Sequence, residues 1–202
     1  MMDISVSVAV VDFIPVLLFF VATFILRRDL YRKMSVSSFT MFATGTLFVF
    51  FAGFFKALYK LLYALGVCDF QALSTMFFPT QSIGFIVAGV GILTAVLGKK
   101  KSATLAAVPP LFSGTFVFVG LMVAGIFSVG AGLCVYAKRL GKGKLAIFFL
   151  LQCLCCTCMG YLSSRDFTQS FMNWLAEGIN IVGQTAFLIG SVKLHKAGLG
   201  DM

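Results

Sequence analysis

The chain has 202 residues, of which 60% are hydrophobic and only 11% are charged, and its mean hydropathy is +1.02. Soluble domains carry roughly a quarter charged residues, so this composition excludes a soluble globular protein and indicates one that resides in the lipid bilayer. The formal net charge of +9 does not indicate nucleic-acid binding, because thirteen of the sixteen Lys and Arg residues follow apolar segments in four short clusters, at 27–33, 99–101, 138–144 and 193–196. That distribution is typical of the positive-inside rule.

Apolar segments of helical length succeed one another along the chain. They predict an all-α, polytopic membrane helix bundle that forms one domain over 1–202. The expected helices cover 6–26, 37–55 with an amphipathic extension to 65, 71–97, 112–137, 145–162 and 171–192.

The first two helices carry charged residues at unusual positions. Asp12 lies so far inside the first apolar run that we expect it within the membrane boundary. Pro15 follows it. Asp12 either caps the helix at the outer interface or lines the entrance of a polar cavity. In the extension of the second helix, Lys56 and Lys60 are one turn apart, which we interpret as a pair of snorkelling interfacial lysines.

The third and fourth helices carry small residues at helical spacing. Gly84 and Ala88 predict a close helix contact. In the fourth helix, a second set recurs every four residues and forms a ridge through which a second copy or a partner subunit could dock: Gly120, Ala124, Ser128 and Gly132.

The number of crossings depends on the element at 102–118, which contains Pro109 and Pro110. Seven crossings place all four basic clusters in the cytoplasm, whereas six divide them between the two sides. We therefore predict about seven transmembrane helices, with six as the alternative, in a multi-pass protein of the cell membrane. Its N-terminus is expected outside and its C-terminus in the cytoplasm.

Two parts of the chain, 5–98 and 112–194, show the same pattern of three helices. In each part a turn with the sequence Asp-Phe precedes the third helix, at Asp69-Phe70 and Asp166-Phe167. We interpret this as an internal repeat of three-helix units, joined by a short or re-entrant element at 102–111. This layout resembles the general architecture of SWEET-type sugar carriers and PnuC-type vitamin carriers, although Pro79-Thr80-Gln81 is not the Pro-Gln dipeptide of the former group.

Polar residues form a stripe on the last helix. Their spacings of four, three and four place them on one face, and Glu177 is the only glutamate in the chain. Polar groups inside a membrane normally face a protein interior or a water-filled cavity. The equivalent helix at 71–97 also has polar residues on one face. We expect a substrate-binding site formed by Asn173, Glu177, Asn180 and Gln184 together with Gln71, Thr75, Gln81 and Asp12.

The cysteines support a different hypothesis. Cys153/Cys156 and Cys155/Cys158 are overlapping C-x-x-C pairs, as a membrane thiol-disulfide oxidoreductase would require, although cysteine also serves as a small apolar filler. No histidine accompanies them, so no metal site is expected. We interpret His195, the only histidine, as a solvated residue of the tail.

These observations favour a membrane transporter for a small molecule or an ion, with a polar cavity lined by the last helix. The first alternative is a non-transporting subunit, either a sensor or an assembly partner, and the second is the thiol redox enzyme. In the first two cases no enzymatic activity and no cofactor are expected, and the sequence does not identify the substrate.

Overall fold

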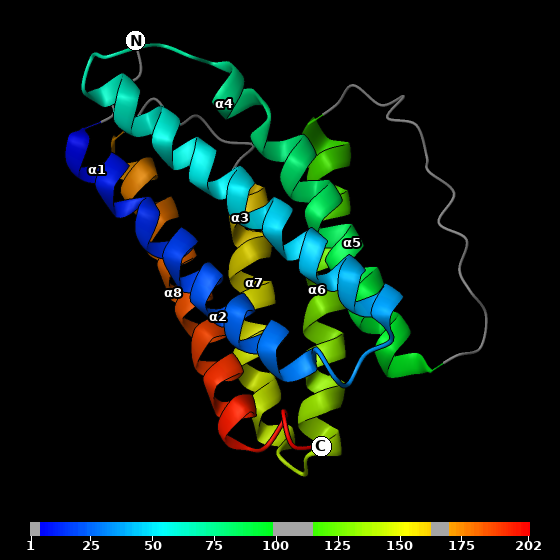
Figure 1. The fold of residues 1–202 in the computed structure, drawn as a ribbon. Helices are drawn as coiled ribbons and strands as arrows, with labels where there is room; N and C mark the ends of the chain where they lie inside the picture. The colour runs from blue at the N-terminus through cyan, green and yellow to red at the C-terminus, as the bar shows by residue number, and fades with distance from the viewer. Residues whose placement is uncertain (1–4, 99–114, 163–169) are drawn as a thin grey trace.

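The structure, a computed structural model, describes residues 5–98, 115–162 and 170–202, and within these ranges it is entirely helical. In chain order it contains α1 (Val6–Val11), α2 (Phe13–Leu30), α3 (Val36–Ala64), α4 (Ala72–Thr75), α5 (Phe77–Leu97), α6 (Thr115–Arg139), the 3₁₀ turn η1 (Gly143–Leu145), α7 (Ala146–Leu162) and α8 (Ser170–Lys196). Figure 1 shows the arrangement of these elements.

Six helical segments among the described residues are long and apolar enough to cross a membrane. They are Val6–Leu30, Val36–Ala64, Ala72–Leu97, Val117–Arg139, Gly143–Leu162 and Phe171–Lys196. The chain is therefore a helical, multi-pass membrane protein. The predicted element at 102–111, the basic cluster Lys99–Lys101 and the turn Asp166-Phe167 lie outside the described residues.

The first predicted helix is divided at Asp12, which separates α1 from α2. Pro15 explains the division, because proline has no backbone N–H to donate to the carbonyl of Val11, four residues earlier. The second helix, by contrast, runs unbroken from its Ser35 cap, whose hydroxyl accepts a hydrogen bond from the Ser38 backbone N–H at 3.2 Å, to Ala64. The residues predicted as an amphipathic extension therefore belong to one long helix.

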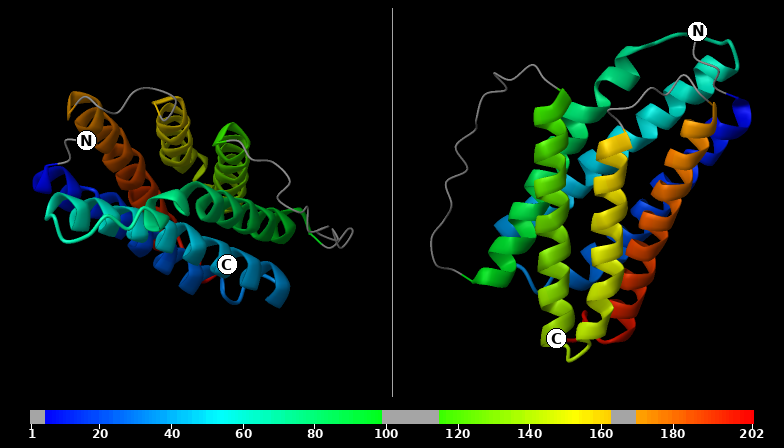
Figure 2. Two further views of the ribbon diagram at one scale, coloured as in Figure 1. Left: turned by 90° about the horizontal axis from the view of Figure 1, so that it is seen from above. Right: turned by 180° about the vertical axis from the view of Figure 1, so that it is seen from behind.

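The six long helices pack in a closed ring with the order α2, α3, α5, α6, α7, α8 and again α2. Seen from above, α2, α3 and α5 form one side of the bundle, and α6, α7 and α8 form the other (Figure 2). Phe19 of α2 joins the two sides, since its ring centroid lies 6.1 Å from that of Phe85 and 5.8 Å from that of Phe187. The centre of the bundle is thus filled by aromatic side chains.

Glycines bring neighbouring helices into close contact. A Cβ added at Gly84 of α5 would lie 2.8 Å from the carbonyl oxygen of Gly45 in α3, so the contact expected at Gly84 and Ala88 is present. Gly89 and Gly125 likewise allow the backbones of α5 and α6 to approach closely. The predicted ridge on α6 is divided: Gly132 packs against Ile92 within the chain, whereas Gly120 is exposed.

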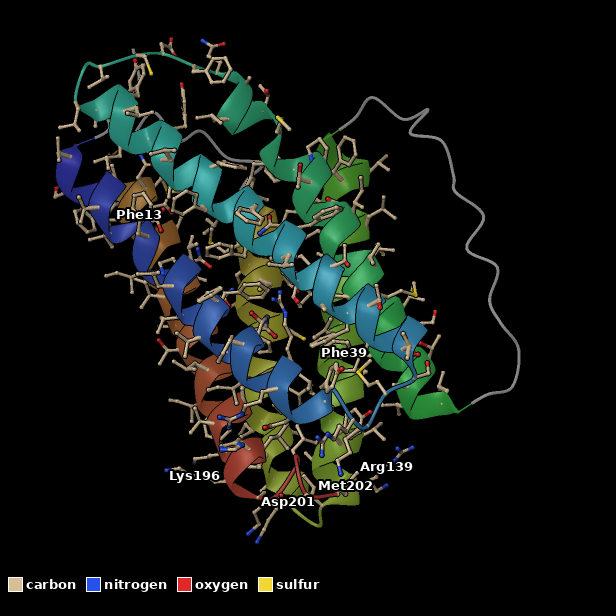
Figure 3. All side chains as sticks on the ribbon, viewed as in Figure 1. Phe13, Phe39, Arg139, Lys196, Asp201 and Met202 are labelled. Atoms are coloured by element: carbon tan, nitrogen blue, oxygen red, sulfur yellow. The ribbon has the colours of Figure 1, made fainter. Side chains whose placement is uncertain are left out.

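Helices α5 and α6 run in the same direction. The Ser82 hydroxyl near the start of α5 donates to the carbonyl of Phe118 near the start of α6, and Arg139 at the end of α6 donates to the carbonyl of Val96, both at 2.6 Å. Consequently α5 ends and α6 begins at opposite ends of the bundle (Figure 1). The basic ends of α6 and α8, marked by Arg139 and Lys196, lie at the end where the chain terminates (Figure 3).

Candidate functional site

A lysine lies between two carboxylates where three helices meet. The Lys60 Nζ is 2.9 Å from the Oδ2 of Asp12 and 2.9 Å from the Oε1 of Glu177. The three side chains are 15%, 11% and 6% exposed, respectively. Charges inside membrane segments are costly and are found paired. This acidic–basic cluster, which we call the Lys60 cluster, satisfies that requirement.

The positions of the three charges follow from the local structure. Asp12 occupies the break between α1 and α2 that Pro15 imposes, Glu177 lies in the second turn of α8, and the long α3 extends far enough to place Lys60 beside both. Lys56, one turn earlier on α3, has a different partner, since its Nζ lies 3.9 Å from the ring centroid of Phe77. Lys60 therefore makes the ion pairs with both carboxylates.

Three buried acceptor atoms have no hydrogen-bond partner within the described part of the chain. They are the Oε2 of Glu177 and the Oε1 atoms of Gln152 and Gln184. The three residues are 4%, 1% and 8% exposed. Buried polar atoms are normally hydrogen-bonded, to protein or to water. Because all three atoms are acceptors, the missing partner of each is a hydrogen-bond donor or a cation.

The structure brings only some of the predicted site residues together. Glu177 and Asp12 meet at Lys60, Gln184 is buried two turns further along α8, and Asn173 and Asn180 are half-buried on the same helix. Gln71 and Thr75 do not reach this cluster. Both are exposed, and they donate to Asp69 and to the carbonyl of Ala72 in their own segment, while Gln81 is half-buried on α5.

Lys60 is the residue that the sequence interpretation placed wrongly. It is not a snorkelling interfacial lysine, because two acidic residues distant in sequence meet at its ammonium group. One signal in the sequence points to this pairing. Only Lys56, Lys60 and Arg165 lie outside the four basic clusters, and Asp12 and Glu177 are likewise isolated in apolar segments. Isolated charges of opposite sign in membrane helices are expected to pair.

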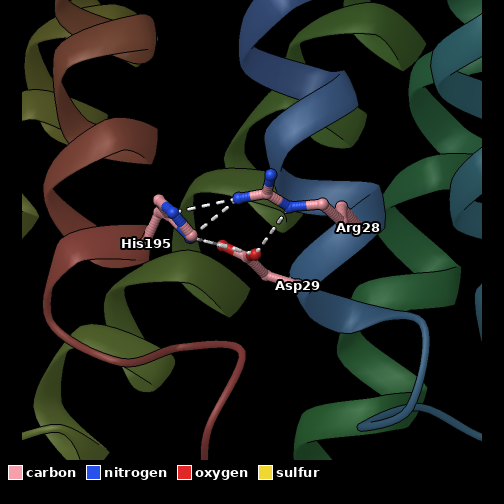
Figure 4. A network of polar contacts seen from close by, with 3 residues as sticks. All are labelled: Arg28, Asp29 and His195. Carbon is pink, nitrogen blue, oxygen red and sulfur yellow. Dashed lines mark hydrogen bonds and ion pairs between the residues drawn. The ribbon is translucent and has the colours of Figure 1, made fainter.

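A second cluster joins α2 to α8 at the other end of the bundle (Figure 4). The Nδ1 of His195 is 3.0 Å from the Oδ2 of Asp29, and the Nη2 of Arg28 is 2.9 Å from the Nε2 of His195. The Asp29 side chain is only 3% exposed. His195 is exposed, as the sequence predicted, but it belongs to α8, which continues to Lys196 and carries the ring to Asp29.

The cysteines occupy tight helix contacts. All six are free, and Cys153 and Cys155 are buried where a Cβ added at Gly130 or Gly183 would lie 2.8 Å from the cysteine side chain. A groove of about 330 Å³ between α7 and α8 is bordered by Thr157, Cys158, Tyr161, Leu162 and Ile179. Among the described residues, no group of three His, Cys, Asp or Glu side chains could hold a metal ion.

Comparison with known proteins provides no family for the chain. No protein-family model, no curated protein and no solved structure matches it.

Proposed function

We propose that this protein is a membrane carrier for a small molecule or an ion, and that the Lys60 cluster forms part of its binding site. The observation that supports the proposal is the position of Lys60 between Asp12 and Glu177, with one oxygen of Glu177 left without a donor. Substrate sites of carriers commonly lie where helices from different parts of the chain meet.

The two carboxylates of the cluster, one of which has an unpartnered oxygen, favour a cation or a proton as one of the species bound. Two carboxylates share the ammonium group of Lys60, while Lys56 is directed to the ring of Phe77. The ammonium group of Lys56 still acts electrostatically on both carboxylates, so the two lysines together balance the two carboxylates when all four groups are ionised. A cationic group at Glu177 would supply the partner that its Oε2 lacks, whereas a proton bound there would convert that oxygen into a hydrogen-bond donor.

Seven crossings with the N-terminus outside remain our proposed topology, and the parallel course of α5 and α6 supports it. Single cysteines at Gly98 and Val117, introduced into a variant without native cysteines, test this directly. We expect a membrane-impermeant thiol reagent to label position 98 from the cytoplasmic side and position 117 from the outside. Labelling of both positions from the same side would contradict the seven-crossing topology.

Ligand binding can be tested without knowledge of the substrate, because a ligand that binds only the folded state raises its stability. The gain is about 2.7 kcal/mol at a hundred times the dissociation constant. We would measure thermal unfolding in detergent with alkali and alkaline-earth cations, protonated amines, amino acids and sugars. At least one solute is expected to raise the melting temperature of the wild-type protein, and Glu177→Gln is expected to abolish that increase.

Asp69→Asn is the matched control, because it makes the same carboxylate-to-amide change in the exposed turn between α3 and α4. It should respond to the solute as the wild-type protein does. An equal response of all three proteins would exclude Glu177 from the binding site, and the absence of any stabilising solute would contradict the carrier proposal.

The second candidate function is a non-transporting membrane subunit. The exposed half of the α6 ridge favours it, because a Cβ added at Gly120 would meet no atom within 4 Å and Ala124 is exposed beside it. A partner helix could pack closely there. If the protein purifies as a stable hetero-complex that Gly120→Leu dissociates, this function replaces the carrier.

A further inference from the structure

Helices α2 and α8 are joined by charged side chains at both ends of their contact. At one end Asp12 and Glu177 share Lys60, and at the other Asp29 contacts His195. Asp12, which directly precedes α2, and Asp29 of α2 are 17 positions apart, and Glu177 and His195 of α8 are 18 positions apart. At 1.5 Å per residue these separations are about 25 Å and 27 Å. They approach the ~30 Å thickness of the hydrocarbon core.

An aromatic pair joins α2 and α8 between the two charged ends. Phe19 and Phe187 stack with their ring centroids 5.8 Å apart. Gln184 lies one turn before Phe187 on α8, is 8% exposed, and its Oε1 has no donor. Between the two charged ends, α8 therefore carries a buried polar group without a partner, two turns from Glu177 on the same helix face and one turn from the aromatic pair.

At each end of the α2–α8 contact, a further part of the chain packs against the charged residues. Lys60 is supplied by α3 at the first end. At the second end the chain that follows α8 folds back, so that Leu199 is fully buried and a Cβ added at Gly200 would lie 3.4 Å from the Oδ1 of Asp29. Ion pairs of this kind separate when water hydrates the charges, because hydration replaces the partner that each charge loses. Apolar side chains that separate gain no comparable compensation from water.

We infer that the contact between α2 and α8 is the route through the proposed carrier, and that the two charged clusters are the closures at its two ends. This inference rests on the carrier function proposed above. Breaking the Lys60 cluster opens the route from the side of Asp12, and breaking the Asp29–His195 contact opens it from the side of the C-terminus. A solute that binds beside Gln184 is expected to donate a hydrogen bond, because the Oε1 of Gln184 is an acceptor without a donor.

A cysteine in place of Gln184, in a variant without native cysteines, reports access to this route. Proteoliposomes of known orientation would be treated from either side with a charged, membrane-impermeant methanethiosulfonate. With both clusters intact, we expect slow labelling from both sides. Lys60→Met is expected to accelerate labelling at least tenfold from the side of Asp12 only, and Asp29→Asn at least tenfold from the opposite side only.

Arg139→Met is the control for general loosening, because it removes a contact between α5 and α6 that lies outside the route. It should leave labelling slow. If Lys60→Met does not fold, Glu177→Gln provides the same test with one carboxylate retained. Equal acceleration of labelling from both sides in a cluster variant, or unchanged labelling in both cluster variants, would overturn the inference.

The outcomes also separate this inference from the proposed function. Side-selective labelling in a protein that no solute stabilises would retain the two closures and reject the carrier. Stabilisation by a solute without side-selective labelling would retain the carrier and reject this route.

Discussion

Replacement of Lys60 by methionine is expected to destabilise the protein by about 3–5 kcal/mol, the usual cost of removing one partner from a buried ion pair. Lys60 is 2.9 Å from each of two carboxylates whose side chains are 11% and 6% exposed. Without the ammonium group, Asp12 and Glu177 would face each other as like charges with little solvent. Methionine keeps the length and the apolar part of the side chain, so the expected loss is electrostatic.

Thermal unfolding in detergent measures this effect. For a chain of this length, 1 kcal/mol corresponds to a change of about 2–4 °C in melting temperature, so Lys60→Met should melt roughly 10 °C below the wild-type protein. Lys138→Met, at an exposed position near the end of α6, is the matched control and should melt as the wild-type protein does.

The triple variant Asp12→Asn, Lys60→Met and Glu177→Gln separates electrostatics from packing. It removes all three charges of the Lys60 cluster and leaves Lys56 over the ring of Phe77, so it should recover most of the lost stability. If Lys60→Met melted with the wild-type protein, the two ion pairs would not contribute to the fold. If the triple variant were no more stable than Lys60→Met, the loss of stability would arise from packing rather than from charge.

Replacement of Gly125 by leucine is expected to disrupt the contact between α5 and α6. A Cβ at Gly125 would lie 2.7 Å from both the backbone nitrogen of Ile86 and the carbonyl oxygen of Phe85. Backbone atoms of a packed helix cannot move aside as the end of a side chain can. Overpacking usually costs about 1–3 kcal/mol and occasionally more, and we expect a loss at or above the upper end of that range.

Gly120→Leu is the matched control on the same helix, because a Cβ at Gly120 meets no atom within 4 Å. Size-exclusion chromatography and thermal unfolding in detergent compare the two variants. Gly125→Leu should give aggregated or strongly destabilised protein, whereas Gly120→Leu should fold and melt as the wild-type protein does. Equal behaviour of the two variants would mean that α5 and α6 do not approach each other at Gly125.

The helical bundle could be predicted from the sequence because its signals are local. Runs of apolar residues, four of which are followed by a basic cluster, identify each of the six candidate membrane-spanning segments within a few residues. Gly84 and Ala88 likewise indicated a close contact, since small residues four apart on a helix permit it. The division at Asp12 was not predicted, although the effect of Pro15 on the carbonyl of Val11 is also local.

The site was predicted only in part, because its central contact is not local. The spacing of the polar residues identified Glu177 and Gln184 as members of one helix face, and both are buried. Helical periodicity cannot show that Lys60, 117 positions before Glu177, meets the same carboxylate. The contact of His195 with Asp29 was missed for the same reason, since the two residues lie 166 positions apart.

Transient currents on a solid-supported membrane test most directly whether the Lys60 cluster binds a translocated charge. Proteoliposomes would be exposed to rapid steps in proton concentration and in the concentration of each cation that stabilises the detergent-solubilised protein. The wild-type protein and Asp69→Asn should produce a current for at least one of these steps, and Glu177→Gln should lose it. A wild-type response no larger than that of empty liposomes, or an undiminished current in Glu177→Gln, would contradict the proposed role of the cluster.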